Sequence, residues 1–239
     1  MKNKFLKKII TTNLLALSMI TMLPICANAA WKSDKNGWWY TEGSSYVKGQ
    51  WKQIGQETYY FYNDGYMAHD AIVDGCYVNS KGERTVKNMP KEVSAYLTKI
   101  HDLGNEVNDI QTALIDINKD GVKELVLWYE KKGEGLAGNT GAVATYYNGN
   151  VILEEIAHHG GIYGYDSSKN AIFGVGGNQG YLTYDGYVLE NGEFKKQYSY
   201  SDGLNALRND CCEINGNKVT ESYYKQVMNQ INTKVIKFK

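Results

Sequence analysis

The sequence predicts a short β-hairpin solenoid followed by an α+β domain with an antiparallel meander sheet. Aromatic residues and glycines recur at a spacing of about twenty residues between positions 31 and 84, which is typical of stacked repeats. A helix-like amphipathic stretch follows Pro90, and later strand-like runs flank Asn-Gly turns. We therefore expect aromatic repeats at 31–84, a linker at 85–91 and an α+β domain at 92–239.

Residues 1–29 have the layout of a secretory signal peptide. Four lysines up to Lys8 precede an apolar stretch, and Ala27-Asn28-Ala29 supplies an A-x-A cleavage site. We expect cleavage after Ala29 and a secreted protein; an uncleaved membrane anchor is the alternative. A lipoprotein at Cys26 is a third interpretation, but Ile25 is larger than the residue that precedes a lipidated cysteine. No later run approaches the ~20 apolar residues of a spanning helix, so no membrane span is expected after signal removal.

Composition excludes two further classes of protein. The chain carries 26 Lys and Arg against 26 Asp and Glu, and this neutral balance argues against a nucleic-acid partner. Beyond the signal peptide the cysteines are Cys76, Cys211 and Cys212, which are too few for a disulfide scaffold. The adjacent pair is compatible with a vicinal disulfide or with two half-buried thiols.

The region from 31 to 84 is organised as repeated hairpins. The aromatic cluster that begins at Trp38 is echoed near Tyr60 and, more weakly, near Tyr77. A glycine follows each cluster where the chain must turn, at Gly43, Gly65 and Gly82. Because one hairpin cannot bury its aromatic face alone, we expect the units to stack on each other.

These repeats resemble a known family. The runs Gly37-Trp38-Trp39-Tyr40, Trp51-Lys52-Gln53-Ile54-Gly55 and Tyr59-Tyr60-Phe61-Tyr62-Asn63-Asp64-Gly65-Tyr66-Met67 closely resemble the cell-wall-binding (choline-binding) repeats of Gram-positive surface proteins. The resemblance implies a β-hairpin solenoid that is associated with the cell wall and holds the choline of teichoic acid, or a wall glycan, between consecutive hairpins. A quaternary ammonium cannot donate a hydrogen bond, so a cage of aromatic faces suits it.

Carried over by position, the resemblance places Trp38, Trp51 and Tyr60 in one choline cage. A second cage would use Tyr59 and Tyr77, but its third position is Ile72 rather than a tryptophan. The alternative is that all these aromatic side chains serve only as the hydrophobic core of a small solenoid.

A metal loop is the most informative motif of the second part. Asp116, Asn118 and Asp120 occupy positions 1, 3 and 5 of an oxygen-rich loop, and Glu124 stands at position 9. With the carbonyl of Val122, this spacing predicts a structural Ca²⁺ site. Both flanks are β-prone, so we expect strand–loop–strand, similar to the calcium loops of integrin-type propeller repeats and of secreted Gram-positive domains. The alternative is a tight turn built without metal.

The remaining elements are predicted from hydrophobic spacing. Val93, Leu97, Ile100 and Leu103 form one apolar stripe of a helix that begins after Pro90. Hairpins are expected at 142–156 and 181–200, a late helix at 220–232 and a last strand at 235–238. The run from Tyr96 to Asn191 resembles secreted Gram-positive domains of no known activity.

No hydrolytic motif is recognisable, so a non-enzymatic binding protein is predicted. Glu154, Glu155, His158 and His159 are residue types that serve as zinc ligands or acid–base groups. A glycine-rich loop is the more ordinary interpretation of the segment that begins at His158. A wall-anchored hydrolase with its active site between His158 and Asn178 is the alternative function.

Overall fold

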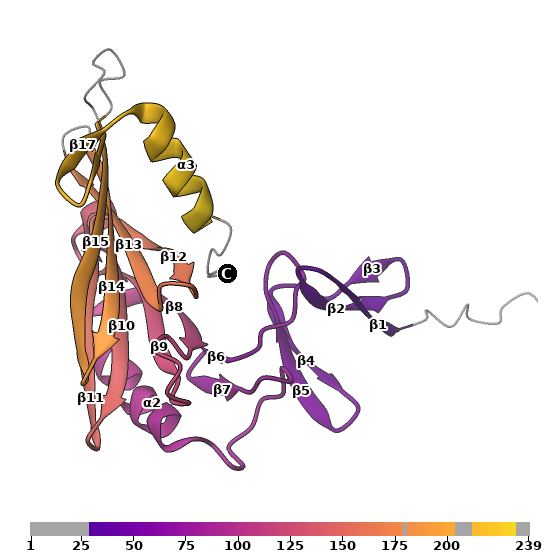
Figure 1. Ribbon diagram of the computed structural model, residues 1–239. Coiled ribbons are helices and arrows are strands. Elements are labelled where there is room, and N and C mark those ends of the chain that lie inside the picture. The colour runs from indigo at the N-terminus through magenta and orange to yellow at the C-terminus, as the bar shows by residue number, and fades with distance from the viewer. Residues whose placement is uncertain (1–28, 179–180, 204–211, 233–239) are drawn as a thin grey trace, which may run out of the picture. The chain divides into compact units, whose positions relative to one another are not determined.

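The computed structural model describes residues 29–178, 181–203 and 212–232 (Figure 1). The expected signal peptide up to position 28, Cys211 and the expected strand at 235–238 lie outside these ranges. Across the described residues, no helix combines the length and apolar character needed to cross a membrane. The chain forms two compact units, one with residues up to Gln50 and Phe61–Met67, the other with Trp51–Tyr60 and residues from Ala68 onward.

Hairpins are found at all three aromatic clusters, as the repeat spacing predicts. The first unit contains a three-stranded antiparallel sheet of β1 (Ala30–Asp34), β2 (Gly37–Glu42) and β3 (Ser45–Tyr46). Two-stranded sheets follow, formed by β4 (Gln50–Ile54) with β5 (Glu57–Phe61), and by β6 (Ala71–Val73) with β7 (Cys76–Val78). The three turn glycines all have positive φ, at Gly43 (64°), Gly65 (89°) and Gly82 (83°).

The chain after each hairpin returns in the same way. In every repeat one backbone amide donates to the carbonyl of a tyrosine of the aromatic cluster: Val47 to Tyr40 at 2.9 Å, Ala68 to Tyr60 at 2.8 Å, and Thr85 to Tyr77 at 3.1 Å. This bond gives the repeats a common backbone frame in which positions can be matched. A continuous solenoid through all repeats stays a prediction.

The third hairpin is part of the core of the second unit. Ile72 and Tyr77 are buried in one cluster with Val93 and Tyr96 of α2 (Lys91–Leu103). The Ile72 amide donates a 2.8 Å hydrogen bond to the hydroxyl oxygen of the buried Thr112. The predicted stripe of α2 is confirmed, because Leu97, Ile100 and Leu103 pack against the same cluster.

The rest of the second unit consists of two antiparallel sheets and a second helix. One sheet has the order β11-β10-β9-β8 and the other the order β12-β13-β14-β15-β16-β17. The strands of the first are β8 (Val107–Ile115), β9 (Glu124–Lys131), β10 (Asn139–Tyr147) and β11 (Asn150–His158). Those of the second are β12 (Gly161–Asp166), β13 (Ala171–Asn178), β14 (Tyr181–Glu190), β15 (Glu193–Gly203), β16 (Cys212–Ile214) and β17 (Asn217–Val219). The predicted meander connectivity is therefore present, divided between two sheets, with a short 3₁₀ helix η1 (Gly135–Gly138) and the late helix α3 (Glu221–Asn232).

Alternation along the strands creates three layers of core. Leu125 and Leu127 of β9 face the cluster under α2, whereas Val126 between them faces the second sheet. In β13, Ile172 faces the first sheet, whereas Phe173 packs in the cluster that contains Tyr224 of α3. Successive residues thus serve different cores, which explains why these strands read as nearly continuous apolar runs.

Glycines allow the two sheets to approach closely. A Cβ on Gly174 would lie 2.7 Å from the Ile156 carbonyl oxygen, and one on Gly141 would lie 2.9 Å from the carbonyl carbon of Gly161. Just before β12, a Cβ on Gly160 would lie 1.8 Å from the Val175 carbonyl oxygen of β13. The segment after His158 was expected to be a loop, but it forms strand β12 from Gly161. This expectation was wrong because glycines that serve sheet packing have the same composition as a flexible loop.

Gly160→Ala should destabilise the second unit by about 3 kcal/mol or more, because the new methyl group meets backbone that cannot move aside. Urea unfolding followed by circular dichroism measures the change. Gly104→Ala is the matched control, since its Cβ would have no neighbour closer than 3.5 Å. Equal unfolding midpoints for Gly160→Ala and the unmodified protein would contradict the packing argument.

Asp166, at the turn between β12 and β13, should make a contribution to stability that is lost in acid. Burial opposes ionisation of Asp166, but hydrogen bonds from Lys169 (2.6 Å) and from the Ser168 hydroxyl (2.6 Å) and amide (2.9 Å) outweigh it. Together they lower the pKa of Asp166 from 3.8 to about 2. Because the folded-state pKa is depressed, this stabilisation is present above about pH 4 and is lost as the pH falls toward 2.

Asp166→Asn should therefore reduce the free energy of unfolding at pH 7 by roughly 2 kcal/mol, with a smaller difference at pH 2. Chemical denaturation at a series of pH values tests this, with the exposed Asp102→Asn on α2 as control. A difference between wild type and Asp166→Asn that does not change with pH would show that the carboxylate charge is not responsible.

Candidate functional site

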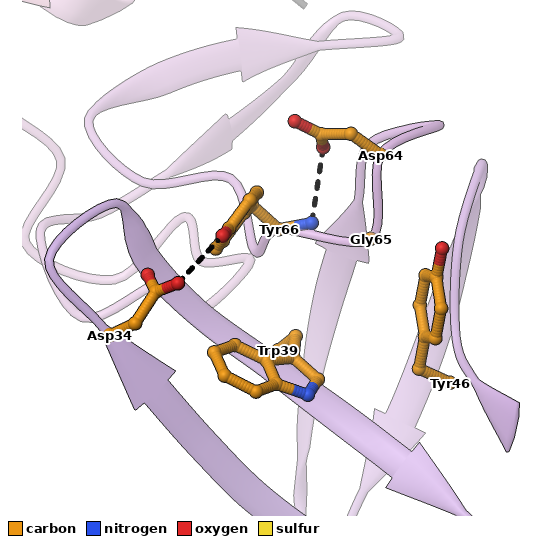
Figure 2. A pocket seen from close by; sticks show the side chains of 6 residues that line it. All are labelled: Asp34, Trp39, Tyr46, Asp64, Gly65 and Tyr66. Carbon is orange, nitrogen blue, oxygen red and sulfur yellow. Dashed lines mark hydrogen bonds between the residues drawn. The ribbon is translucent and has the colours of Figure 1, made fainter. Parts of the chain in front are cut away.

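A pocket in the first unit is lined by aromatic rings and carboxylates. It has a volume of about 260 Å³ and is bordered by Asp34, Trp39, Tyr46, Asp64, Gly65 and Tyr66. Figure 2 shows the rings of Trp39, Tyr46 and Tyr66 around it, with the two aspartates on the side of Tyr66.

Strand alternation directs Trp39 into this pocket and Trp38 away from it. Trp38 packs edge-on to Trp31 at 6.5 Å between ring centroids, and 51% of its surface is exposed. Trp39 points to the opposite face of β2, where its ring stands at 86° to that of Tyr66 with centroids 6.0 Å apart. One tryptophan therefore serves the hairpin packing and its neighbour serves the pocket.

Gly65 lets the third ring approach. A Cβ at this position would lie 2.4 Å from two ring atoms of Tyr46, so only glycine permits this contact. The Tyr46 ring also lies 5.9 Å from the Lys48 ammonium, which is within cation–π distance.

The carboxylates are fixed by hydrogen bonds to the pocket's own residues. Asp34 accepts a 2.7 Å bond from the Asn36 amide and a 2.9 Å bond from the Tyr66 hydroxyl. The bond from Asn36 is the main reason that the pKa of Asp34 is below its ordinary value. Asp64 accepts a 3.1 Å bond from the Tyr66 amide. Tyr66 is thus tied to both aspartates.

The chemistry of this pocket favours a cation. Aromatic faces attract positive charge through their quadrupole, and an ionised carboxylate at the rim adds to the attraction. The pocket is large enough for a trimethylammonium group, and its walls combine the π faces that such a group needs with negative charge.

The residues of the predicted choline cage fall in both units. Trp51 and Tyr60 are in contact, with centroids 5.2 Å apart and ring planes at 64°. Trp38 belongs to the first unit, whereas Trp51 and Tyr60 belong to the second. This three-residue cage stays a prediction.

The second, doubtful cage also stays a prediction. Tyr77 is buried in the core beside Val93 and Tyr96, with 9% of its surface exposed. Tyr59 is half-buried, and burial is the main reason that its pKa is raised.

The predicted calcium loop joins β8 to β9, as the strand–loop–strand expectation requires. Asp116 accepts backbone bonds from Asp120 (3.1 Å) and Gly121 (3.1 Å), and Asp120 accepts one from Val122 (2.8 Å). The Asn118 side-chain amide donates to Asp120 at 2.9 Å. Each carboxylate oxygen retains a further lone pair, so these bonds are compatible with a metal ligand role.

Glu124 is the buried member of this loop. Its carboxylate accepts a 2.8 Å bond from the Ile117 amide, and only 1% of the residue is exposed. Burial, reinforced by the negative charges of Asp120 and Asp116, raises the pKa of Glu124 to about 7. Among residues 29–178, 181–203 and 212–232, no three His, Cys, Asp or Glu side chains are grouped so as to hold a metal.

The residues considered for hydrolysis do not form a carboxylate pair. Glu154 and Glu155 are adjacent on β11, so they point to opposite faces of the sheet. Burial opposes ionisation of Glu155, but bonds from Lys131 (2.8 Å) and the Tyr129 hydroxyl (2.8 Å) outweigh it and lower its pKa. An acid held ionised in this way is a poor proton donor at neutral pH.

The two histidines are held in different ways. The Nδ1 of His158 lies 3.5 Å from Glu155, and 62% of the His158 side chain is exposed. The Nδ1 of His159 donates to the Ala137 carbonyl at 2.6 Å. The structure therefore accounts for the two histidines and the following glycines by local bonding and sheet packing. Of the cysteines, Cys76 is half-buried and Cys212 is buried.

Sequence reasoning missed Trp39, Tyr46 and Tyr66 as a set. The available signal was the alternation of β2, which sends Trp39 to the face opposite Trp38. Asp34 also stands five positions before Trp39, and Asp64 stands two positions before Tyr66. Matching by repeat position selected residues from one face of the hairpins instead.

Comparison with known proteins gives weak similarities. No protein-family model and no curated protein matches the chain. The modular Cpl-1 endolysin complexed with a peptidoglycan analogue is 15% identical over 71% of this chain and 37% of its own, with a TM-score of 0.25. The modular autolysin LytC from Streptococcus pneumoniae, in complex with a synthetic peptidoglycan ligand, is 14% identical over 73% of this chain and 31% of its own, with a TM-score of 0.23. The chain thus spans well under half the length of these proteins, and such low TM-scores support no inference about it.

Proposed function

We propose that this is a secreted, cell-wall-associated binding protein that captures a quaternary ammonium group, such as the choline of teichoic acid, in the pocket of Trp39, Tyr46 and Tyr66. The observation that supports it is the convergence of three aromatic rings with Asp34 and Asp64 around one small cavity. The resemblance of the repeats to wall-binding repeats points to the same class of ligand.

The pocket suits a ligand that is displayed many times on a polymer. An exposed cation–π contact provides on the order of 0.5–1 kcal/mol, and a desolvated one about 2 kcal/mol, so a single cage binds weakly. A polymer that presents many identical head groups raises the effective ligand concentration and compensates for weak single-site affinity. Wall retention therefore follows from the density of the ligand.

Trp39→Ala should weaken binding of choline about tenfold or more, because it removes the ring that faces Tyr66. NMR titration of the indole N–H signals with choline chloride measures the affinity, and sedimentation with choline-bearing cell walls measures retention. Trp38→Ala is the matched control, since it removes the same side chain from the neighbouring position and opposite face of β2.

The control also tests the cage of Trp38, Trp51 and Tyr60. A loss of binding in Trp38→Ala with none in Trp39→Ala would favour that cage and contradict the pocket. Unchanged indole signals in the wild-type protein at 100 mM choline, about a hundredfold above a 1 mM dissociation constant, would contradict both.

We further propose that the β8–β9 loop holds a structural Ca²⁺ through Asp116, Asn118, Asp120, the Val122 carbonyl and Glu124. The 1-3-5-9 spacing of oxygen-bearing side chains in the loop between β8 and β9 supports this. A divalent cation would also stabilise the ionised form of the Glu124 carboxyl, whose pKa is raised by burial and by the charges of Asp120 and Asp116. Calcium bound here would fix the connection between two core strands.

Millimolar calcium should raise the melting temperature by a few degrees relative to chelator, since an affinity of about 10⁻⁴–10⁻³ M stabilises the fold by roughly 0.5–1.5 kcal/mol. Differential scanning calorimetry measures the shift. Asp120→Asn keeps the side-chain shape and should abolish the shift, whereas Asp109→Asn on β8 should retain it. Identical melting temperatures with calcium and chelator in the wild type would rule out the site.

A further inference from the structure

An arginine that follows β7 in the sequence lies on an aromatic face of the hairpin of β4 and β5. The Arg84 guanidinium lies over the Trp51 ring, 5.4 Å from its centroid, which is within cation–π distance. Trp51 in turn packs edge-on against Tyr60 at 5.2 Å. Two rings and a guanidinium are therefore combined in a segment where the repeat family implies an external cation.

The other contacts of Trp51 complete the surroundings of a cation site. Its indole N–H donates to the Asp74 carboxylate at 2.8 Å, which fixes the orientation of the ring. The charge of Asp74 also reaches Tyr60, where it adds to burial in raising the pKa of the hydroxyl. A carboxylate beside two aromatic faces is the same combination that lines the Trp39 pocket.

The backbone holds Arg84 in position. Its amide donates to the Thr58 carbonyl at 2.8 Å, and the residue forms an isolated antiparallel bridge with Val78. The side chain therefore starts from a fixed point beside β5. A guanidinium that is anchored in this way loses little freedom on lying over Trp51, which favours it over a diffusing ligand.

Comparison of the repeats shows that the position of Arg84 does not carry a cation in both of them. The bridge of Val78 with Arg84 matches that of Phe61 with Met67, so Arg84 stands where the preceding repeat has an apolar side chain. In the first hairpin, the Trp31 and Tyr40 rings have the same 5.2 Å centroid separation as Trp51 and Tyr60 have in the second. There the Phe61 ring packs against Trp31, with centroids 5.7 Å apart. The ring that contacts Trp31 thus comes from the position matched by Val78, whereas the guanidinium over Trp51 comes from the position matched by Met67.

We propose that Arg84 is the built-in ligand of the Trp51–Tyr60 aromatic site and excludes external alkylammonium groups from it. While Arg84 is in place, this hairpin adds no ammonium-binding site to the module. Removal of the guanidinium uncovers the Trp51 face beside Asp74 and creates a site for a quaternary ammonium. This inference stands independently of whether the Trp39 pocket binds choline.

Titration of the full chain with tetramethylammonium chloride tests the proposal through the Trp51 indole N–H signal in ¹⁵N NMR spectra, assigned by its loss in Trp51→Phe. In the wild type this signal should hold its position, because the guanidinium covers the ring. In Arg84→Ala the signal should shift and saturate. Its half-saturation concentration should be about two- to fivefold lower than that of any weak shift that the wild type shows. Arg84→Lys should behave as the wild type does, because it keeps a cation at the site.

Lys81→Ala is the control for loss of positive charge without loss of the contact, and it should leave the Trp51 signal unresponsive. Equal half-saturation of that signal in the wild type and Arg84→Ala would overturn the proposal, as would a silent signal in Arg84→Ala with an otherwise unchanged spectrum. Arg84→Gln gives a second neutral variant that keeps the length of the side chain. The Trp39 signal, followed in the same spectra, reports on the proposed function separately.

Discussion

A two-stranded hairpin cannot bury an aromatic face by itself, and the repeat region from β1 to β7 is organised by that constraint. Each of the three hairpins covers its aromatic side chains in a different way. The Trp31 ring is covered by Phe61, an apolar contact. The Trp51 ring is covered by a guanidinium, and the third hairpin places Ile72 and Tyr77 in the core beneath α2. The repeats share a backbone frame, yet the chemistry that closes them changes from one to the next.

The candidate pocket forms on the face of β2 that does not take part in the packing around Trp31. In β2, the residues on one face pack against Trp31, so the alternate residue, Trp39, faces away from that cluster. The turn that carries Tyr66 approaches this second face, and its hydroxyl is tied to Asp34 at 2.9 Å. The candidate pocket and the hairpin packing thus use adjacent tryptophans, because a strand directs successive side chains to opposite sides.

Sequence patterns predicted the hairpins, α2 and the strand–loop–strand connection, because these depend on local spacing and turn chemistry. The apolar stripe through Val93 and Leu97 needs only helical periodicity to be recognised. The pocket could not be predicted in the same way, since it depends on which face of β2 the turn at Gly65 approaches. Strand β12 was also missed, because its first glycine is required by the neighbouring sheet: a Cβ on Gly161 would lie 2.9 Å from the Trp128 ring of β9, and local composition does not record that.

The shortness of the repeat array has a structural reason. A stack of hairpins leaves an aromatic face exposed at its end unless a different unit covers it. Here the third hairpin has short strands and an isoleucine, Ile72, where the resemblance would place a tryptophan, and this residue is 4% exposed in a core shared with Val93. The Leu114 amide donates at 2.8 Å to the Asp70 carbonyl just before β6, so the hairpin is also attached to β8 through the backbone. The departures of the third repeat from the repeat pattern therefore adapt it to the α+β core that it joins.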